Sequence, residues 1–309
     1  MRRSMAGVAA VALLLVFVFA GLRISLTEGN DGAVISHSIV PLAGDVVLTL
    51  PGGDRMNLEH AGSDSVLREE EELLILHTEG VLTFSKKDLP LQQEIRYAKL
   101  DVPKGIQFEF VLEDGTRVWL NADSHLRFPA VFAEGERRVY LQGEAYFEVV
   151  HNANSPFIVE TEHQILHVLG TRFNVCSYSG ENVVTTLVDG SVSVRPAAGE
   201  KNIVLKPNQE SRLDPVAGDF SLRTVNALEM IAWKDGAFVF EGKTLEYAMN
   251  LLARRYDFAY NFEDENLKTL ELMGIMPPAD DIASILNLIE LLGYVEFVIE
   301  GNHIKIKRK

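Results

Sequence analysis

The strongest constraint on the fold is a repeated β-strand pattern that begins near Ile39 and continues to Leu213. Short runs rich in Val, Phe, Tyr and Thr alternate with Gly, Asp, Asn and Pro at intervals of roughly ten residues. Such runs are typical of strands that are joined by tight turns. The pattern therefore predicts a mainly β domain, of the jelly-roll or β-sandwich kind, over residues 39–226.

An Asp-Gly pair recurs three times in front of an alternating apolar run, at 112–120, 187–194 and 233–240. Asp-Gly favours turns that need a positive φ, and such turns commonly connect the two strands of a hairpin. The unequal spacings argue against a solenoid repeat. We therefore expect a hairpin turn at each of these three places.

The apolar period changes from that of strands to that of helices after Trp233. Thr244 can cap one helix, and Asp280 or Asp281 can cap a second one that ends before Gly293. The apolar positions of these helices are Leu245, Ala248, Met249, Leu252 and Tyr256, then Ile282, Ile285, Leu286, Ile289 and Leu292.

Five strand-like runs accompany the two predicted helices: 237–242, 258–262, 269–275, 296–300 and 303–307. Gly301-Asn302 between the last two is a hairpin signal. The order predicts a small α+β module of the βαβ type at 229–309. A module of this size cannot close its sheet, so we expect an open edge at 269–275 or 303–307 that could bind a partner strand.

The N-terminus is apolar and uncharged from Ser4 to Leu22, and Arg2 and Arg3 precede this run. Its length suits one membrane span, and the arginines predict a cytoplasmic N-terminus. We therefore expect a transmembrane helix within residues 1–24 and a linker at 25–38. A signal peptide cleaved after Val18-Phe19-Ala20 is the alternative. Both interpretations place the rest of the chain outside the cytoplasm.

Charge and cysteine usage exclude two classes of function. The chain of 309 residues has a formal net charge of −15, so its field repels phosphate backbones, which argues against nucleic acid as a partner. Cys176 is the single cysteine, which excludes an intrachain disulfide framework and a Cys-rich metal site.

Glu144 and Glu148 in "GEAYFEVV" are the most suggestive pair of carboxylates. In a strand their backbones lie about 13 Å apart, whereas glycosidase carboxylates lie about 5–9.5 Å apart. We therefore expect a structural role, with Phe147 and Val149 facing a core and the glutamate face wet or ion-paired. A carbohydrate-active or carbohydrate-binding β protein that uses Glu144 and Glu148 is the alternative.

Two further motifs give no site. His163 and His167 have the spacing of metal ligands on a helix, but they lie among strand-like runs without a third ligand. Gly242-Lys243-Thr244 lacks the glycine spacing of a phosphate-binding loop, and Thr244 is better explained as a helix cap. The sequence thus predicts no catalytic residue, no cofactor and no metal, and the protein is not expected to be an enzyme.

Five stretches in a fixed order resemble the FecR family of periplasmic signal-relay and anti-sigma proteins, in the form usual in Bacteroidota. They are "VPKGIQFEFVLEDGTRVWLNADSHLRFP", "ERRVYLQGEAYFEVV", "PFIVET", "VLGTRFNV" and "TTLVDGSVSV", and the likeness is strongest over 102–214. Residues 229–309 resemble the domain that commonly follows FecR and is similar to the STN (secretin and TonB N-terminal short) domain.

The resemblance implies a single-pass inner-membrane protein whose bulk is periplasmic. It would relay a signal from the N-terminal signalling domain of a TonB-dependent outer-membrane receptor to an extracytoplasmic-function sigma factor. The family carries a cytoplasmic arm before the membrane, whereas only about Met1–Ser4 precede the apolar run here. We therefore expect that this form of the chain does not itself hold a sigma factor.

Overall fold

The computed structural model describes residues 44–309 except 59–64, 70–72, 79–80, 87–94, 200, 277–278 and 280. The predicted membrane anchor and linker lie outside the described residues. Among the residues that are described, no helix is both long enough and apolar enough to cross a membrane. All of them belong to one unit, His37–Lys309.

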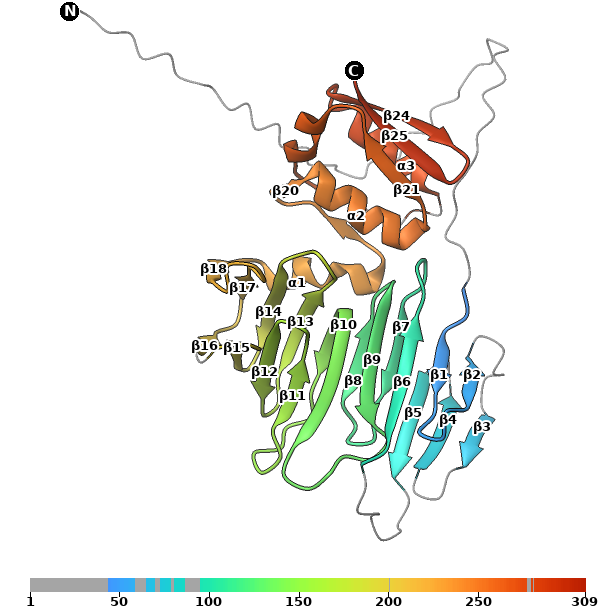
Figure 1. Cartoon of the computed structure of the whole chain (residues 1–309), viewed down its shortest axis with the longest axis vertical. Coiled ribbons are helices and arrows are strands. Elements are labelled where there is room, and N and C mark those ends of the chain that lie inside the picture. The colour runs from blue at the N-terminus through green and yellow to red at the C-terminus, as the bar shows by residue number, and fades with distance from the viewer. Residues whose placement is uncertain are drawn as a thin grey trace, which may run out of the picture. The chain divides into compact units, whose positions relative to one another are not determined.

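Two large sheets that share one strand form the β domain (Figure 1). The first sheet has the order β2 (Arg55–Asn57), β1 (Val47–Thr49), β6 (Tyr97–Val102), β9 (Ser124–Pro129), β10 (Arg137–Glu148), β11 (Phe157–Glu160), β12 (Gln164–Val168), β15 (Val192–Pro196) and β16 (Ile203–Leu205). The second has the order β3 (Ser65–Glu69), β4 (Leu73–Thr78), β5 (Val81–Lys86), β7 (Phe108–Val111), β8 (Arg117–Leu120), β10, β13 (Arg172–Ser177), β14 (Val183–Asp189), β17 (Gln209–Leu213) and β18 (Phe220–Thr224). The prediction of a mainly β, sandwich-like domain is confirmed.

The strand β10 changes sheets at Gly143. Its first half pairs with β9 and β11, and its second half pairs with β8 and β13. Gly143 has a φ of 98°, and a Cβ atom there would lie 2.7 Å from the Cα atom of Ser124. Only glycine tolerates both that conformation and that approach, so the bend of β10 depends on this residue.

The hydrophobic core lies between the two sheets. Ala145, Phe147 and Val149 face it, as the alternation in β10 predicts, and Phe147 is fully buried. The ring of Phe147 stacks on Phe173 at a centroid distance of 5.2 Å and contacts Phe157 at 6.0 Å. Apolar alternation thus defines the inner face of this strand correctly.

Only one of the three Asp-Gly pairs forms the predicted hairpin. Gly115 has a φ of 84° and lies between the paired strands β7 and β8. Gly190 also has a positive φ, but it follows β14 of one sheet and precedes β15 of the other. Gly236 ends a short 3₁₀ helix. The predictions for Gly190 and Gly236 were therefore wrong, because Asp-Gly specifies a local backbone conformation and not which strands pair.

The rest of the chain contains the predicted α+β module. Its elements and the segment before them are α1 (Ala227–Met230), η1 (Ala232–Asp235), β19 (Phe238–Val239), β20 (Lys243–Thr244), α2 (Leu245–Tyr256), β21 (Ala259–Phe262), η2 (Glu265–Thr269), β22 (Glu271–Leu272), β23 (Ile275–Met276), α3 (Ile282–Glu290), β24 (Val295–Glu300) and β25 (His303–Arg308).

The helix signals of this module are confirmed. The hydroxyl of Thr244 accepts a hydrogen bond from the Tyr247 N–H at 3.2 Å, and the carboxylate of Asp281 caps α3. All five predicted apolar positions of α2 are buried, whereas Leu292 lies beyond the end of α3 and is 41% exposed.

Of the two predicted edges of the module, 303–307 was wrong, whereas 269–275 contains two short strands that each pair on one side only among the described residues. Residues 303–307 lie in β25, which is the central strand of the sheet β21–β25–β24 and pairs on both sides. Residues 269–275 do not form one strand. The last residue of η2, Thr269, is followed by β22 and β23, which pair separately with β20 and β19. Local pattern cannot show which strand of a sheet is central, because that depends on pairing between distant segments.

Replacement of Phe147 by alanine tests the core between the two sheets. We expect Phe147→Ala to lower the free energy of unfolding by about 3–5 kcal/mol, because it removes a buried ring that contacts two others. Urea unfolding of the purified chain measures this change. Val216, which is 96% exposed, provides the control Val216→Ala, with an expected change below about 0.5 kcal/mol. Equal effects of the two substitutions would contradict the placement of Phe147.

Candidate functional site

The strand β10 carries both glutamates that the sequence singles out. Glu144, Tyr146 and Glu148 lie on the face opposite Phe147, as predicted. The expectation that this face is wet or ion-paired was wrong for Glu144, which is 8% exposed, and for Tyr146, which is 2% exposed. The alternation in β10 cannot show that a segment almost ninety residues later in the sequence covers its second face.

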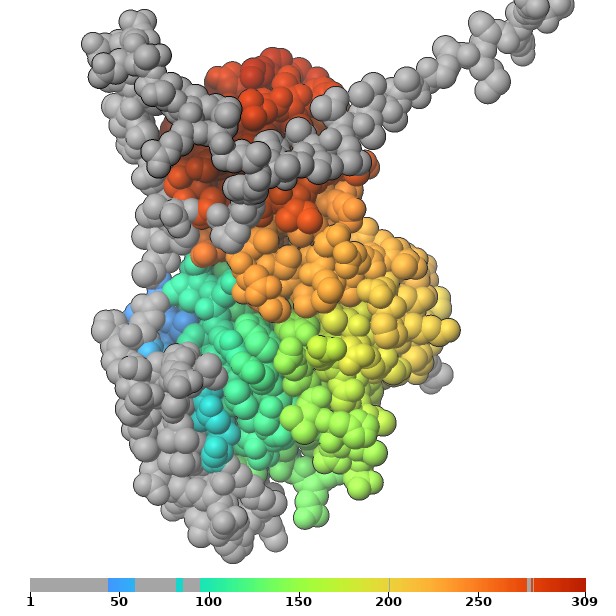
Figure 2. All heavy atoms as spheres, turned by 180° about the vertical axis from the view of Figure 1, so that it is seen from behind, coloured from blue at the N-terminus to red at the C-terminus, as the bar shows by residue number. Residues whose placement is uncertain are grey.

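The covering segment is the pair of short helices α1 and η1. Ile231 and Trp233 from this segment pack on Tyr146 in a small buried cluster of their own, separate from the core between the sheets. Trp119 and Val188 border the cluster. In Figure 2, seen from behind, the orange part of the chain lies against the yellow and green parts of the β domain. The second sheet is therefore covered on its outer face at Tyr146 of β10.

Two asparagines hold the carboxylate of Glu144. The Asn121 side-chain amide donates to one oxygen at 2.8 Å, and the Asn174 side-chain amide donates to the other at 2.9 Å. The Glu144 backbone N–H donates to the hydroxyl of Ser124 at 2.9 Å. These bonds satisfy a carboxylate that is otherwise removed from water.

The orientation of both asparagine amides is fixed by other donors. The Asn121 side-chain oxygen accepts from the Ala122 backbone N–H at 2.9 Å. The Asn174 side-chain oxygen accepts from the indole N–H of Trp233 at 3.1 Å. Neither amide can therefore flip without losing a bond, and both must present their N–H groups to Glu144. A chain of hydrogen bonds thus links Glu144 to Trp233 in the segment that joins the β domain to the C-terminal module.

Burial sets the direction of the pKa of Glu144. Loss of water around the carboxyl raises its pKa above the ordinary value, while the two amides and the charge of Arg254 pull it in the opposite direction. Glu148, in contrast, is half-buried and accepts a hydrogen bond from the Tyr146 hydroxyl at 3.3 Å. The two glutamates therefore occupy different environments and do not converge on a common cleft.

The helix α2 adds polar contacts with the β domain. The guanidinium of Arg254 forms an ion pair with Glu181 at 2.7 Å and lies 3.8 Å from the ring centroid of Tyr178. The carbonyl of Arg254 accepts from the Gly105 N–H at 2.9 Å, and the side chain of Arg255 donates to the Gly105 carbonyl. The last turn of α2 is therefore held at two places on the β domain.

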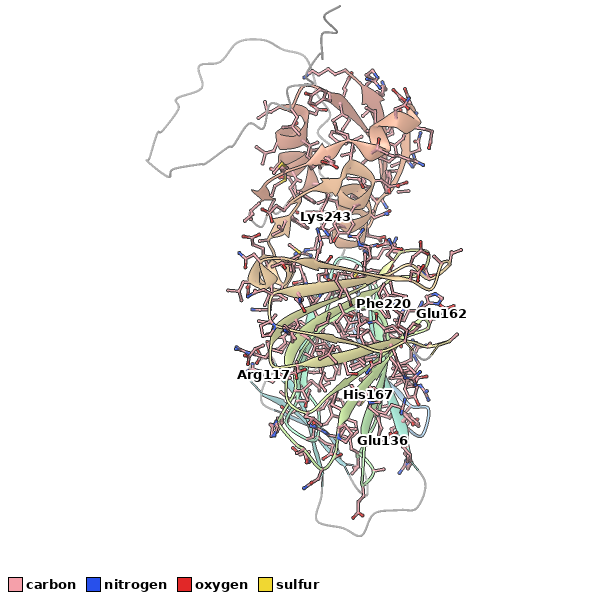
Figure 3. All side chains as sticks on the ribbon, turned by 90° about the vertical axis from the view of Figure 1, so that its left-hand side faces the viewer. Arg117, Glu136, Glu162, His167, Phe220 and Lys243 are labelled. Atoms are coloured by element: carbon pink, nitrogen blue, oxygen red, sulfur yellow. The ribbon has the colours of Figure 1, made fainter. Side chains whose placement is uncertain are left out.

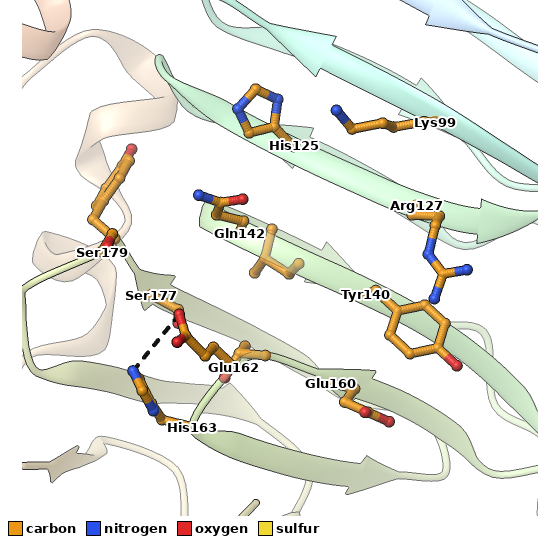
Figure 4. Close-up of a pocket in the computed structure, with 13 residues that line it drawn as sticks. Lys99, His125, Arg127, Tyr140, Gln142, Glu160, Glu162, His163, Ser177 and Ser179 are labelled. Carbon is orange, nitrogen blue, oxygen red and sulfur yellow. Dashed lines mark ion pairs between the residues drawn. The ribbon is translucent and has the colours of Figure 1, made fainter. Parts of the chain in front are cut away.

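A groove of about 420 Å³ lies on the outer face of the first sheet (Figure 4). It opens where β10 leaves this sheet after Gln142 and where β11 ends at Glu160. The guanidinium of Arg127 lies between two rings there, 3.9 Å from the centroid of Tyr140 and 4.4 Å from that of Tyr97. This surface is polar and aromatic, and the one ion pair between the lining residues drawn in Figure 4 joins His163 to Glu162.

The remaining sequence motifs also have structural places. His163 pairs with Glu162 at 3.8 Å, and His167 lies in β12, where burial lowers its pKa. In the part of the chain that the structure describes, no three His, Cys, Asp or Glu side chains gather as metal ligands would. Lys243 and Thr244 form β20 and the start of α2, not a phosphate-binding loop.

Sequence reasoning missed the residues that organise this site: Asn121, Asn174, Glu181, Trp233 and Arg254. One signal was available, because Asn is disfavoured in strands, yet Asn174 interrupts the strand-like run "TRFNV" and Asn121 directly follows another. A buried asparagine needs polar partners, so each position indicated a hydrogen-bonded network. The identity of the partners depends on the fold and could not be read from these runs.

Removal of the Glu144 charge tests its structural role. We expect Glu144→Gln to lower the free energy of unfolding by about 1–3 kcal/mol, because the new amide N–H₂ would face the N–H₂ group of Asn121 or Asn174. The matched control is Glu148→Gln on the same face, with an expected change below about 0.5 kcal/mol. Denaturant unfolding of the purified variants measures both. Equal stability of Glu144→Gln and the wild type would contradict the network.

The raised pKa of Glu144 also predicts a pH dependence. A carboxyl whose pKa is higher in the folded state than in the unfolded state contributes stability at low pH and loses that contribution as the pH rises through its folded pKa. The free energy of unfolding should therefore fall as the pH rises above the ordinary range of glutamate, about 4.3. This part of the slope should be missing in Glu144→Gln. The same slope in both proteins would contradict the assignment.

Comparisons with known proteins agree with this architecture. The family description "FecR protein" matches residues 98–193, and "FecR, C-terminal" matches residues 237–306. The second match covers the α+β module, whose likeness to an STN domain stays a prediction. No curated protein matches the chain at a significant level.

Solved structures that are similar to the chain include two from one organism. A crystal structure at 1.65 Å of a candidate anti-sigma factor from Parabacteroides distasonis ATCC 8503 has a TM-score of 0.65 and 26% identity, and covers 68% of this chain and 99% of that chain. A second crystal structure with the same description, at 2.50 Å, has a TM-score of 0.64 and 26% identity, and covers 69% and 99%. With both family matches in the expected order on the expected folds, the chain belongs to the FecR family and is a FecR-type signalling regulator.

Proposed function

We propose that this FecR-type regulator is a membrane-anchored, non-enzymatic relay. Its bulk lies in the periplasm and binds the N-terminal signalling domain of a TonB-dependent outer-membrane receptor, and its output is control of an extracytoplasmic-function sigma factor. The apolar run at 4–22 supports the anchor, and the family matches with the similar anti-sigma structures support the output.

The observation that carries the receptor contact is the outer edge of β24. Among the described residues, β24 pairs only with β25. The Phe297 N–H points away from β25, because it donates to the side chain of Glu290 at 2.6 Å. Backbone groups alternate in direction along an antiparallel strand, so the groups of Ile299 also face outward. An added strand can therefore pair at Ile299, whereas at Phe297 it would have to displace the carboxylate of Glu290.

Exposed apolar side chains lie beside this edge. Leu288, Leu291, Leu292 and Tyr294, at the end of α3 and just before β24, are between 41% and 81% exposed. An exposed apolar group of this kind next to unpaired backbone is typical of a surface that binds another protein. The backbone would supply affinity and the apolar side chains would supply specificity.

Proline at Ile299 tests backbone pairing with the receptor. Ile299→Pro removes one outward N–H, and we expect at least about tenfold weaker binding of the cognate signalling domain with the fold retained. Ile299→Ala is the matched control, since it shortens the same side chain and keeps the N–H. Titration calorimetry measures binding, and circular dichroism checks the fold of each variant.

Two outcomes would contradict the proposal. Equal binding by Ile299→Pro and Ile299→Ala would exclude pairing at this edge. Failure of the wild-type chain to bind the signalling domain of any TonB-dependent receptor from the same organism would overturn the relay itself.

A further inference from the structure

A second cavity lies between the second sheet and the start of α2. It has a volume of about 440 Å³ and is lined by β13, β14 and β17 on one side and by the first turns of α2 on the other. Its walls include Cys176 and Thr186 from the sheet and Tyr247 and Asn250 from the helix. This cavity is separate from the edge of β24 and from the groove of the first sheet.

Every carboxylate that lines the cavity has a partner. Glu144 accepts from two asparagine amides, as described above. The other three form ion pairs: Glu181 with Arg254 at 2.7 Å, Glu210 with Arg223 at 2.7 Å, and Glu246 with Lys268 at 3.5 Å. The acidic groups of the wall are therefore already neutralised or hydrogen-bonded.

Two basic side chains, Lys243 and Arg212, also line the cavity. Among the described residues, neither Lys243 nor Arg212 has a side-chain hydrogen bond or ion pair, although both line the cavity. Lys243 is only 8% exposed, and its ammonium lies 4.7 Å from the ring centroid of Tyr247. Figure 3 labels Lys243 where the C-terminal module meets the β domain. Burial of an ammonium is costly and lowers the pKa of Lys243; the charges of Arg223 and Arg212 act in the same direction, while the charge of Glu210 opposes them.

The helix and the apolar groups define the rest of the site. The first turn of α2 borders the cavity, and the positive end of a helix dipole favours an anion there. The ring of Tyr247 and the side chains of Met230 and Val184 add apolar surface. The chemistry of the wall therefore suits an organic ligand with a negatively charged group at one end.

We propose that this cavity binds a small organic carboxylate, with Lys243 and Arg212 as its counter-ions and the ring of Tyr247 against its apolar part. The inference goes beyond the receptor relay and does not depend on it. Arg212 belongs to β17 of the β domain and Lys243 to β20 of the C-terminal module, so a bound carboxylate links the two by charge. Binding therefore stabilises the contact between them.

Binding of 4-fluorobenzoate to the full chain, followed by ¹⁹F NMR, tests the site. We expect saturable binding, at least tenfold weaker in Lys243→Met and in Arg212→Met. Lys206→Met, at an exposed residue outside the cavity, is the matched control and should bind as the wild type does. The neutral 4-fluorobenzyl alcohol and the cationic 4-fluorobenzylamine should not compete.

Alkylation of Cys176 gives a second readout at the same cavity. Cys176 is the single cysteine, so the intact mass of the chain reports its modification. Saturating 4-fluorobenzoate should slow its reaction with iodoacetamide at least several-fold in the wild type and in Lys206→Met, and not in Lys243→Met. This comparison still decides the proposal if one cavity variant fails to fold, because wild-type protection remains measurable.

Three results would overturn the proposal: no saturable binding by the wild type, equal affinity in wild type, Lys243→Met and Arg212→Met, or competition by the neutral alcohol. None of these results bears on the receptor relay, which is measured with the signalling domain alone. Loss of receptor binding with retained binding of 4-fluorobenzoate would in turn leave the cavity site intact.

Discussion

The fold depends on the passage of β10 from one sheet to the other at Gly143. A positive φ of 98° and the close approach of Ser124 leave no room for a Cβ atom there. The bend places Phe147 in the core between the sheets and sends Glu144 to the outer face of the second sheet. One glycine thus determines both the central packing of the sandwich and the position of the carboxylate that is linked through Asn174 to the covering segment.

Polar contacts determine how the covering segment lies on the second sheet. The apolar cluster of Tyr146, Ile231 and Trp233 is small, whereas the bonds from Glu144 through Asn174 to the Trp233 indole have a fixed direction. Apolar contact alone tolerates many orientations, but a fully satisfied buried network permits few. The carboxylate therefore contributes specificity to this contact, because its burial carries a desolvation cost that only the native partners offset.

Much of the fold could be predicted from the sequence, and the failures share one cause. The apolar positions of α2, the caps at Thr244 and Asp281, and the inner face of β10 depend on neighbours in the sequence, and all were predicted correctly. The environment of Glu144, the central place of β25 and the path after Gly190 depend on segments that are distant in the sequence. Local periodicity carries no information about such pairings, so the candidate site was less predictable than its scaffold.

Any signal that passes from the C-terminal module to the β domain must act through the contact that α2 and the covering segment make with the β domain. A partner that binds at the outer edge of β24 can alter the β domain only if the C-terminal module can contact the β domain in two arrangements. The partner must also bind one of these arrangements more tightly than the other. The groups that would distinguish such arrangements lie at that contact: the ion pair of Arg254 with Glu181 and the indole bond of Trp233. Both are lost if α2 and the covering segment move away. Asn174 then loses the Trp233 N–H that fixes the orientation of its amide toward Glu144. The ion pair of Arg254 with Glu181 is largely buried, with side-chain exposures of 12% and 22%. Separating two such charges before water can reach them leaves their desolvation cost uncompensated, so the contact resists partial opening and favours an all-or-none change.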